Sequence, residues 1–244
     1  MEKVETILPY AGSGATKTVQ VETMFDNIAP KYDLLNHTLS VGIDKIWRNV
    51  ACKILLQDKP DTILDIAAGT GDFSLLAAKK SSAHITALDL SQAMLNIARQ
   101  KAIKAKLDNN ISFVKGDSLN LPFDNNTFDC VSVAFGVRNF EDIRAGLNEI
   151  FRVLKPGGRI VVLELAEPDN KIVKSVYNIY FKHFLPLLGK WVSKDDQAYK
   201  YLPRSVDNFP YGKPFLNIMN NCNFSSTQLK KLSCGLAVVY NGIK

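Results

Sequence analysis

Hydrophobic positions along the chain switch repeatedly between a spacing of three or four residues and short continuous runs. The first spacing is typical of helices that pack one face on a core, and it is clear over residues 43–54. The continuous runs favour buried strands at residues 62–66, 84–89, 111–114, 128–135 and 159–164. Helical spacing returns between them, at 91–106 and 142–154. This alternation predicts an open α/β fold, in which a mostly parallel sheet carries helices on both faces.

The two ends of the chain depart from this alternation, but no linker separates them from the rest, so we expect one domain. The N-terminal part shows no periodicity and contains small polar side chains, which predicts a flexible arm. The C-terminal part has an apolar helical stretch at 170–192 and two final strands, of which we expect the last to be antiparallel. The four parts are the arm (1–20), a helical segment interrupted at Pro30 (21–57), the sheet core (61–166) and a cover with the final strands (167–244).

The composition is that of an ordinary globular protein. The chain has 244 residues, 46% hydrophobic and 22% charged, without the apolar run of about 18 residues that a membrane span needs. Four cysteines and three histidines lack the spacing of a zinc site, so we expect no metal, free thiols and a cytoplasmic location. The net charge is +6, but no basic stretch carries interleaved aromatic residues, and we expect no nucleic-acid partner.

A loop with two glycines follows the first predicted strand, where an open α/β sheet binds its ligand. It runs from Asp65 through Gly69, Thr70 and Gly71 to Asp72. Glycine lets a ligand approach the backbone and adopts positive φ without strain. A dinucleotide fingerprint needs a third glycine where this chain has Ser74, and Asp72 would repel a pyrophosphate. Asp65 and Asp72 favour a ligand with positive charge, such as the ammonium and sulfonium groups of S-adenosylmethionine.

Acidic residues also end the next two predicted strands. Asp89 can accept both ribose hydroxyls of a nucleotide, and Asp117, with Ser118 beside it, can face an adenine. Each of these residues alone could equally be a solvated loop carboxylate or a helix cap, and the position of Asp89 also suits NAD. Together, acids at three consecutive strand ends predict an adenosyl cofactor.

Several motifs carry a resemblance to a known family. The glycine loop, the Leu-Pro-Phe of residues 121–123 and the segment 152–158 resemble class I S-adenosylmethionine methyltransferases, which have a Rossmann-like open sheet. Residues 24–33 and the Phe-Gly-Val-Arg-Asn of residues 135–139 are similar to the narrower UbiE/MenG family of quinol C-methyltransferases. The resemblance implies S-adenosylmethionine as cofactor and a polyprenylated quinol as substrate. That quinol is either demethylmenaquinol, in menaquinone biosynthesis, or a benzoquinol precursor of ubiquinone.

The resemblance also implies roles for individual residues. Gly69, Thr70 and Gly71 would hold the methionine part of the cofactor, Asp89 the ribose, and Asp117 with Ser118 the adenine. The chain departs from the family pattern at Leu35, Asp44, Ala134 and Ala166, where Met, His, Ser and Ser are expected. None of these changes touches the glycine loop, but Ala134 cannot make the contact of a serine hydroxyl.

Methylation of a ring carbon needs an aligned, dry site and an electron-rich ring that afterwards loses a proton. Arg138 and Asn139 follow the fourth strand, at the same sheet edge as the glycine loop. We expect Arg138 to stabilise a phenolate and to position a water that takes the proton, Asn139 to orient a ring oxygen, and Tyr32 to face the ring. The alternatives are a surface or capping arginine, an asparagine that caps the next helix, and a tyrosine that only packs.

The apolar stretch at 170–192 includes Lys171, Lys174, Lys182 and Lys190. A basic amphipathic stretch favours peripheral contact with a membrane surface, where a polyprenylated quinol resides. Packing on the core or in a homodimer would give the same pattern. A methyltransferase for another small molecule and a cofactor-binding protein without catalysis remain as alternatives, because cofactor binding survives the loss of chemistry.

Overall fold

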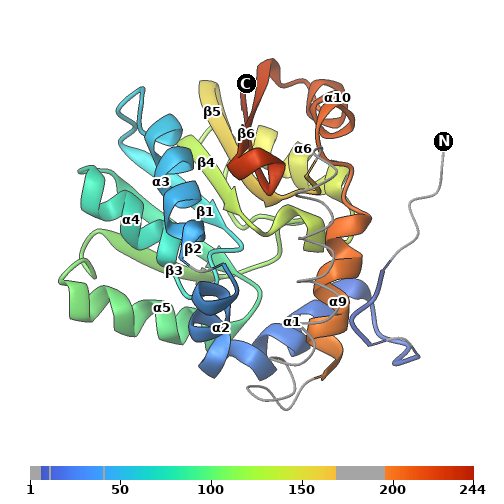
Figure 1. Cartoon of the computed structure of the whole chain (residues 1–244). Helices are drawn as coiled ribbons and strands as arrows, with labels where there is room; N and C mark the ends of the chain where they lie inside the picture. The colour runs from blue at the N-terminus through green and yellow to red at the C-terminus, as the bar shows by residue number, and fades with distance from the viewer. Residues whose placement is uncertain (1–6, 11, 41, 169–195) are drawn as a thin grey trace.

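The computed structural model describes residues 7–10, 12–40, 42–168 and 196–244, which form an α/β structure around one central sheet (Figure 1). Its strands are β1 Thr62–Ile66, β2 His84–Asp89, β3 Ile111–Lys115, β4 Phe128–Ala134, β5 Leu154–Leu165, β6 Ser225–Leu232 and β7 Ala237–Ile243. The order across the sheet is β3-β2-β1-β4-β5-β7-β6, and β7 is antiparallel to β5 and β6. The predicted mostly parallel sheet with an antiparallel C-terminal strand is confirmed.

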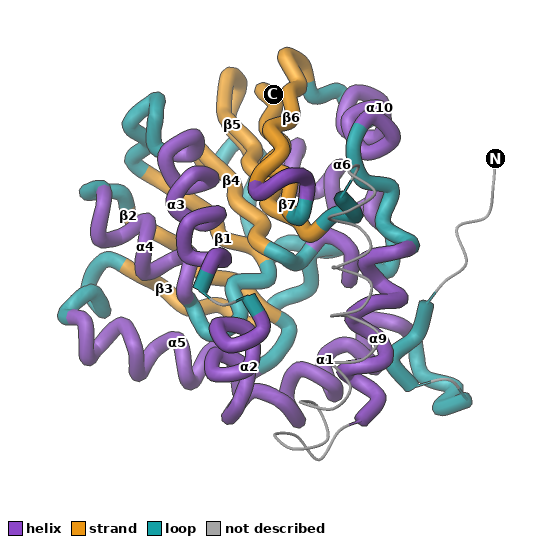
Figure 2. The backbone as a smooth tube through the Cα atoms, viewed as in Figure 1, coloured by secondary structure: helices purple, strands orange, loops and turns teal. Residues whose placement is uncertain are grey.

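Helices cover both faces of this sheet (Figure 2). Helices α3 (Ile43–Leu55), α4 (Asp72–Lys80) and α5 (Gln92–Ala105) pack on one face. Helices α6 (Ile143–Val153) and α10 (Lys213–Asn221) pack on the other. The sheet therefore has apolar side chains on both faces, which explains the continuous apolar runs in its strands.

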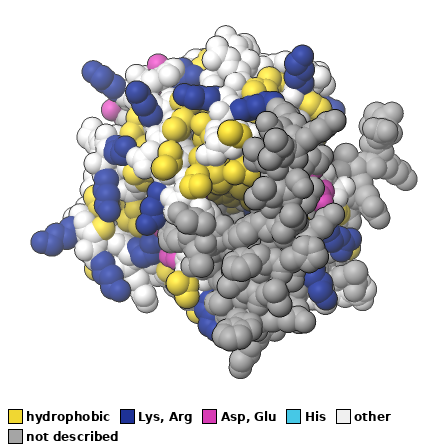
Figure 3. Space-filling model, in the orientation of Figure 1, with side chains coloured by type: hydrophobic (Ala, Val, Ile, Leu, Met, Phe, Trp, Pro, Cys, Tyr) yellow, Lys and Arg dark blue, Asp and Glu magenta, His cyan; other side chains and the backbone are white. Residues whose placement is uncertain are grey.

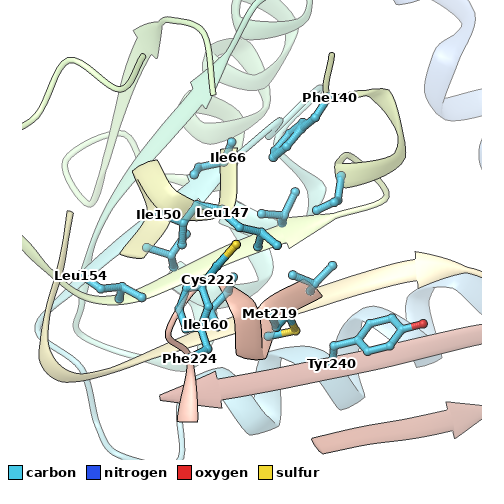
Figure 4. Packing of buried hydrophobic residues seen from close by; sticks show 14 of the residues in the cluster. Ile66, Phe140, Leu147, Ile150, Leu154, Ile160, Met219, Cys222, Phe224 and Tyr240 are labelled. Atoms are coloured by element: carbon cyan, nitrogen blue, oxygen red, sulfur yellow. The ribbon is translucent and has the colours of Figure 1, made fainter. Parts of the chain in front are cut away.

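Neighbouring residues of one strand supply the two cores. Ile63 of β1 is in the cluster beneath α3 and α4, whereas Leu64 and Ile66 are in the cluster beneath α6 and α10. Figure 4 shows the second cluster, in which Leu147 of α6 lies near the sheet. All four side chains are fully buried, and burial of each stabilises the fold by about 1.5–3 kcal/mol.

In the described residues of the N-terminal part, a helix begins earlier than expected and one side chain packs in a cluster, while flexibility of the arm stays a prediction. Helix α1 (Lys17–Ile28) already begins inside it, and the Thr16 hydroxyl caps the helix by accepting from the backbone N–H of Val19. Ile7 is buried in a small cluster with Met24 and Tyr201. The partners of Ile7 are distant in sequence, so the pattern of residues within the arm does not predict this packing.

The rest of the chain follows the prediction with shifted boundaries. The interruption at Pro30 is the short 3-10 helix η1 (Ala29–Lys31), after which α2 (Tyr32–Leu39) begins at once. Strand β5 begins at Leu154, earlier than expected, because the segment before Arg159 joins the ladder with β4 through a register irregularity. After the undescribed residues the chain resumes in α9 (Asp196–Asp207).

The apolar stretch at 170–192 lies outside the described residues, so membrane contact and dimerisation stay predictions. Among the described ranges, each helix is too short or too polar to cross a bilayer. In the view of Figure 3, Lys and Arg side chains are scattered around the edge of the face, and hydrophobic side chains gather near its centre.

Candidate active site

A cleft lies at the carboxyl ends of the parallel strands, around the boundary between β1 and β4. The loops after β1 and β4 lead to opposite halves of the sheet at this boundary, which is where open α/β sheets bind ligands. The cleft encloses about 710 Å³, including space open to solvent. It is lined by these predicted site residues: Gly69, Asp89, Asp117, Ser118, Asn139 and Tyr32. Residues from four loops and the N-terminal helices thus meet at one space.

The glycine loop turns sharply between β1 and α4. Gly69 and Gly71 both have positive φ, of 56° and 80°, as expected. A Cβ on Gly71 would lie 2.9 Å from the Cβ of Ala98, so this glycine also lets α4 approach α5. The Thr70 hydroxyl donates to Oδ1 of Asp33 at 2.5 Å, so the side chain is tied to α2. Gly69 lines the cleft, whereas Thr70 and Gly71 do not.

The two acids around this loop do not provide a free negative charge for a ligand, contrary to our expectation. The carboxylate of Asp65 is buried and accepts from the hydroxyls of Ser74 and Ser132. Burial raises the pKa of Asp65 to about 6. Asp72 pairs with Lys101. Both acids therefore hold the loop in place, and neither lines the cleft.

Asp89 sits at the end of β2 with both carboxylate oxygens held by backbone donors. The N–H of Gly69 donates to Oδ2 at 2.7 Å, and the N–H of Ser91 donates to Oδ1 at 2.8 Å. Burial raises the pKa of Asp89 to about 6, and these backbone hydrogen bonds limit the rise. The carboxylate is therefore mostly ionised at neutral pH, and it can accept a further hydrogen bond from a ligand in the cleft.

The loop after β3 contributes Asp117 and Ser118. Oδ1 of Asp117 accepts from the N–H of Leu119 at 2.9 Å, which fixes the carboxylate at the cleft wall. Ser118 beside it is buried and also lines the cleft. Both residues thus lie at the cleft, and their role toward an adenine stays a prediction.

The loop after β4 touches the loop after β1 through a glycine. A Cβ on Gly136 would lie 2.5 Å from the Cβ of Ala67, so no other residue fits without a shift of the loops. Phe135 before it has a positive φ of 62°, a strained conformation for a bulky residue. The Phe135 ring lies 5.2 Å from the guanidinium carbon of Arg48. This packing directs the following 3-10 helix η2 (Val137–Asn139) to the cleft.

Arg138 is buried beside the cleft, so the alternative of a surface arginine is excluded. Its side chain is 7% exposed, and Nη1 lies 2.8 Å from Oε2 of the fully buried Glu164. Burial is the largest single influence and alone would lower the pKa of Arg138, but the charge and hydrogen bond of Glu164, together with nearby Tyr32 and Tyr201, outweigh it and raise this pKa. Nε is buried and makes no hydrogen bond to the described residues. Arg138 lines a second cavity of about 890 Å³, which shares Phe140 and Glu141 with the cleft.

Asn139 and Tyr32 line the cleft itself. Asn139 does not cap the next helix, because the Asp142 carboxylate accepts from the N–H groups of Arg144 and Ala145 at the start of α6. Tyr32 packs edge-on against Phe25, with ring centroids 5.9 Å apart, and both rings form part of the cleft wall. Burial raises the pKa of Tyr32, and the hydroxyl stays protonated at neutral pH.

Helix α1 contributes a part of the cleft that the sequence did not predict. Thr18, Val21, Glu22 and Phe25 line it from above the strand ends. Helix α1 is held there because the Asp26 carboxylate accepts from the Ser91 hydroxyl at 2.5 Å. Nothing in the spacing of these residues distinguishes a cleft wall from an ordinary amphipathic helix. Within the described ranges, no group of three His, Cys, Asp or Glu is placed to hold a metal.

The sheet order and the cleft at its switch point define a class I methyltransferase fold. A solved structure described as a putative S-adenosyl-L-methionine-dependent methyltransferase from Methanococcus maripaludis is similar to this chain, with a TM-score of 0.61 and 26% identity. The likeness covers 88% of this chain and 92% of that one.

The chain belongs to the ubiE/COQ5 methyltransferase family, whose model matches residues 13–244. A demethylmenaquinone methyltransferase from Bacteroides fragilis is 46% identical over 98% of both chains. A ubiquinone/menaquinone biosynthesis C-methyltransferase, UbiE, from Geotalea daltonii is 42% identical over 93% of this chain and 97% of its own length. The protein is therefore a methyltransferase, and the predicted resemblance is confirmed.

Proposed function

We propose that the protein transfers the methyl group of S-adenosylmethionine to a ring carbon of demethylmenaquinol, which gives menaquinol. The names of the curated relatives support this substrate. The observation that carries the proposal is that most residues expected at the cofactor and two of those expected at the ring, Asn139 and Tyr32, line one cleft. A cofactor and an acceptor ring bound there would be held next to each other.

The cleft residues fit S-adenosylmethionine. Asp89 lines the cleft with a carboxylate that can accept further hydrogen bonds, which suits the ribose hydroxyls. Asp117 and Ser118 lie at the wall proposed for the adenine, and Met94 adds an apolar surface. Because the Thr70 side chain is held by Asp33, we assign the methionine part to the backbone of the glycine loop. When bound, the cofactor supplies an electrophilic methyl group on a positively charged sulfur.

The ring-side residues prepare the acceptor. We assign to Asn139 and Tyr32 the binding of the quinol ring at the cleft wall. Arg138 lies beside this wall in an ion pair with Glu164, and we assign to its guanidinium the stabilisation of the phenolate form of the quinol, with a water as acceptor of the ring proton. Helix α1, with Phe25, covers part of the cleft and limits the access of bulk water, which strengthens each of these interactions.

The test of the proposed function is product mass. The purified protein is incubated with S-adenosylmethionine and prenylated demethylmenaquinol, and the extracted quinone is expected to gain the mass of one methyl group. A benzoquinol precursor of ubiquinone is assayed in parallel, because the name of the Geotalea relative covers both pathways. Methylation of the benzoquinol alone would show that the benzoquinol, and not demethylmenaquinol, is the substrate. Methylation of neither quinol would overturn the proposal.

The role of Arg138 is tested by Arg138→Ala and Arg138→Lys. We expect both to lower turnover, the alanine variant by about a hundredfold or more, while cofactor affinity measured by calorimetry stays within about twofold. Arg159→Ala is the matched control, because Arg159 pairs with Asp58 away from the cleft and is expected to leave turnover unchanged. Unchanged turnover of Arg138→Ala would remove its catalytic role, and lost cofactor binding would move Arg138 to the cofactor site.

A further inference from the structure

A tyrosine from the C-terminal part of the chain contacts Asn139. Tyr201 lies on α9 and is 4% exposed. Its hydroxyl donates to Oδ1 of Asn139 at 3.2 Å. Asn139 lines the cleft, whereas Tyr201 lines the second cavity, so the tyrosine reaches the asparagine without occupying the cleft.

The Tyr201 hydroxyl acts as a donor to this amide. Burial raises the pKa of Tyr201 to about 12, so the hydroxyl keeps its proton at neutral pH. Within the described residues, the amide oxygen of Asn139 is its hydrogen-bond acceptor. A buried hydroxyl proton without an acceptor is costly, which favours the amide orientation that places Oδ1 next to Tyr201.

The tyrosine ring is itself held in place. It packs in the small cluster with Ile7, Met24 and Ala198, which joins the N-terminal part of the chain to α1 and α9. All three residues are buried. The hydroxyl therefore has a defined position, and the orientation that it imposes on Asn139 is defined too.

We propose that Tyr201 is a positioning residue that fixes the amide of Asn139 so that its NH₂ group faces the substrate. With Oδ1 engaged by Tyr201, the polar group that Asn139 has left for a ligand in the cleft is the Nδ2 amide, which carries two donors. A phenolate oxygen accepts hydrogen bonds and cannot donate them. An amide turned the other way would present its oxygen to the phenolate and repel it. The identity of this ring oxygen rests on the proposed function.

A double-mutant cycle tests this assignment. Tyr201→Phe keeps the ring and removes the donor, and we expect kcat to fall about tenfold while the affinity for S-adenosylmethionine is unchanged. In the Asn139→Ala background the same substitution is expected to have no further effect on kcat, because Tyr201 acts through Asn139. Unchanged kcat in Tyr201→Phe, or an equal loss in both backgrounds, would overturn the proposal.

Tyr240→Phe is the matched control. Tyr240 is also buried, and its hydroxyl accepts from the N–H of Gly212 at 2.6 Å, outside the cleft. We expect this variant to lose stability without a change in kcat. A fall in kcat equal to that of Tyr201→Phe would show a general effect of a lost buried hydroxyl and would contradict the assignment.

A second measurement needs no substrate. In the ¹⁵N–¹H spectrum of the labelled protein, the side-chain NH₂ signals of Asn139 are expected to shift in Tyr201→Phe and to stay in place in Tyr240→Phe. Unshifted signals in Tyr201→Phe would remove the hydrogen bond on which the inference depends. If the signals shift but wild-type protein methylates no quinol, the proposed function fails and the positioning contact stands.

Discussion

The buried pair of Glu164 and Arg138 allows a sharp prediction about stability. Glu164 is fully buried in β5, and its carboxylate accepts from the side chain and the backbone N–H of Arg138. Glu164→Gln keeps the shape of the side chain and removes its charge. The variant therefore leaves the guanidinium of Arg138 buried without a counter-charge.

The size of the effect follows from the distance and the burial. At the 2.8 Å between Nη1 and Oε2, the attraction is about 6 kcal/mol for an effective dielectric constant of about 20. Desolvation of both groups offsets much of this attraction when the pair forms. Removal of one partner alone restores no hydration to the other, and we expect Glu164→Gln to lower the free energy of unfolding by about 3–5 kcal/mol.

Urea unfolding at neutral pH measures this loss. Asp58→Asn is the matched control, because the pair of Asp58 and Arg159 has the same chemistry but Asp58 is 57% exposed, and a loss below about 1 kcal/mol is expected. The double variant Arg138→Met with Glu164→Gln is expected to lose less than the sum of its single variants, since neither charge is then left alone. A loss in Glu164→Gln as small as that in Asp58→Asn, or full additivity in the double variant, would refute the reasoning.

Two further predictions concern the cofactor side of the cleft. Gly71→Ala is expected to lower the free energy of unfolding by about 2–5 kcal/mol, from its positive φ and from the 2.9 Å contact with Ala98. Gly157 has a φ of 77°, and a Cβ added there would meet nothing within 4 Å. Gly157→Ala is therefore expected to lose only the free energy that comes from the positive φ, and equal losses of the two variants in urea unfolding would disprove the clash. For Asp89, the folded pKa of about 6 lies above the ordinary 3.8, so its ionised form is lost as pH falls through 6. Affinity for S-adenosylhomocysteine is therefore expected to fall about fivefold between pH 6 and pH 5, and a calorimetric profile that Asp89→Asn does not flatten would assign the dependence to another group.

Much of the fold follows from local pattern. The apolar runs of β1, β2 and β4 are buried on both faces of the sheet. Because both faces are buried, the strand can be recognised from its own continuous apolar sequence. Asp89, Asp117 and Ser118 line one cleft because the carboxyl ends of adjacent parallel strands necessarily meet at one edge. Such residues need only the strand order to be located.

The misjudged residues depend on contacts between distant segments. In the sequence, Asp65 and Asp72 look like residues that bind a ligand. Asp65 is instead bound by Ser132, 67 residues away, and Asp72 by Lys101, 29 residues away. Ile7 and Tyr201 meet across most of the chain. Neither spacing nor composition carries such pairings, and only the folded structure shows that Arg138 is buried against Glu164.

The central claim is that the cleft at the boundary of β1 and β4 brings a methyl donor to a quinol ring. Its most direct test uses S-adenosylmethionine with a deuterated methyl group, prenylated demethylmenaquinol and the purified protein, followed by mass spectrometry of the extracted quinone. We predict one fully deuterated methyl group on the ring for wild type, and much slower incorporation for Asp89→Ala at the same cofactor concentration. Recovery of unlabelled demethylmenaquinone from the wild-type reaction, or incorporation that Asp89→Ala does not slow, would contradict the account.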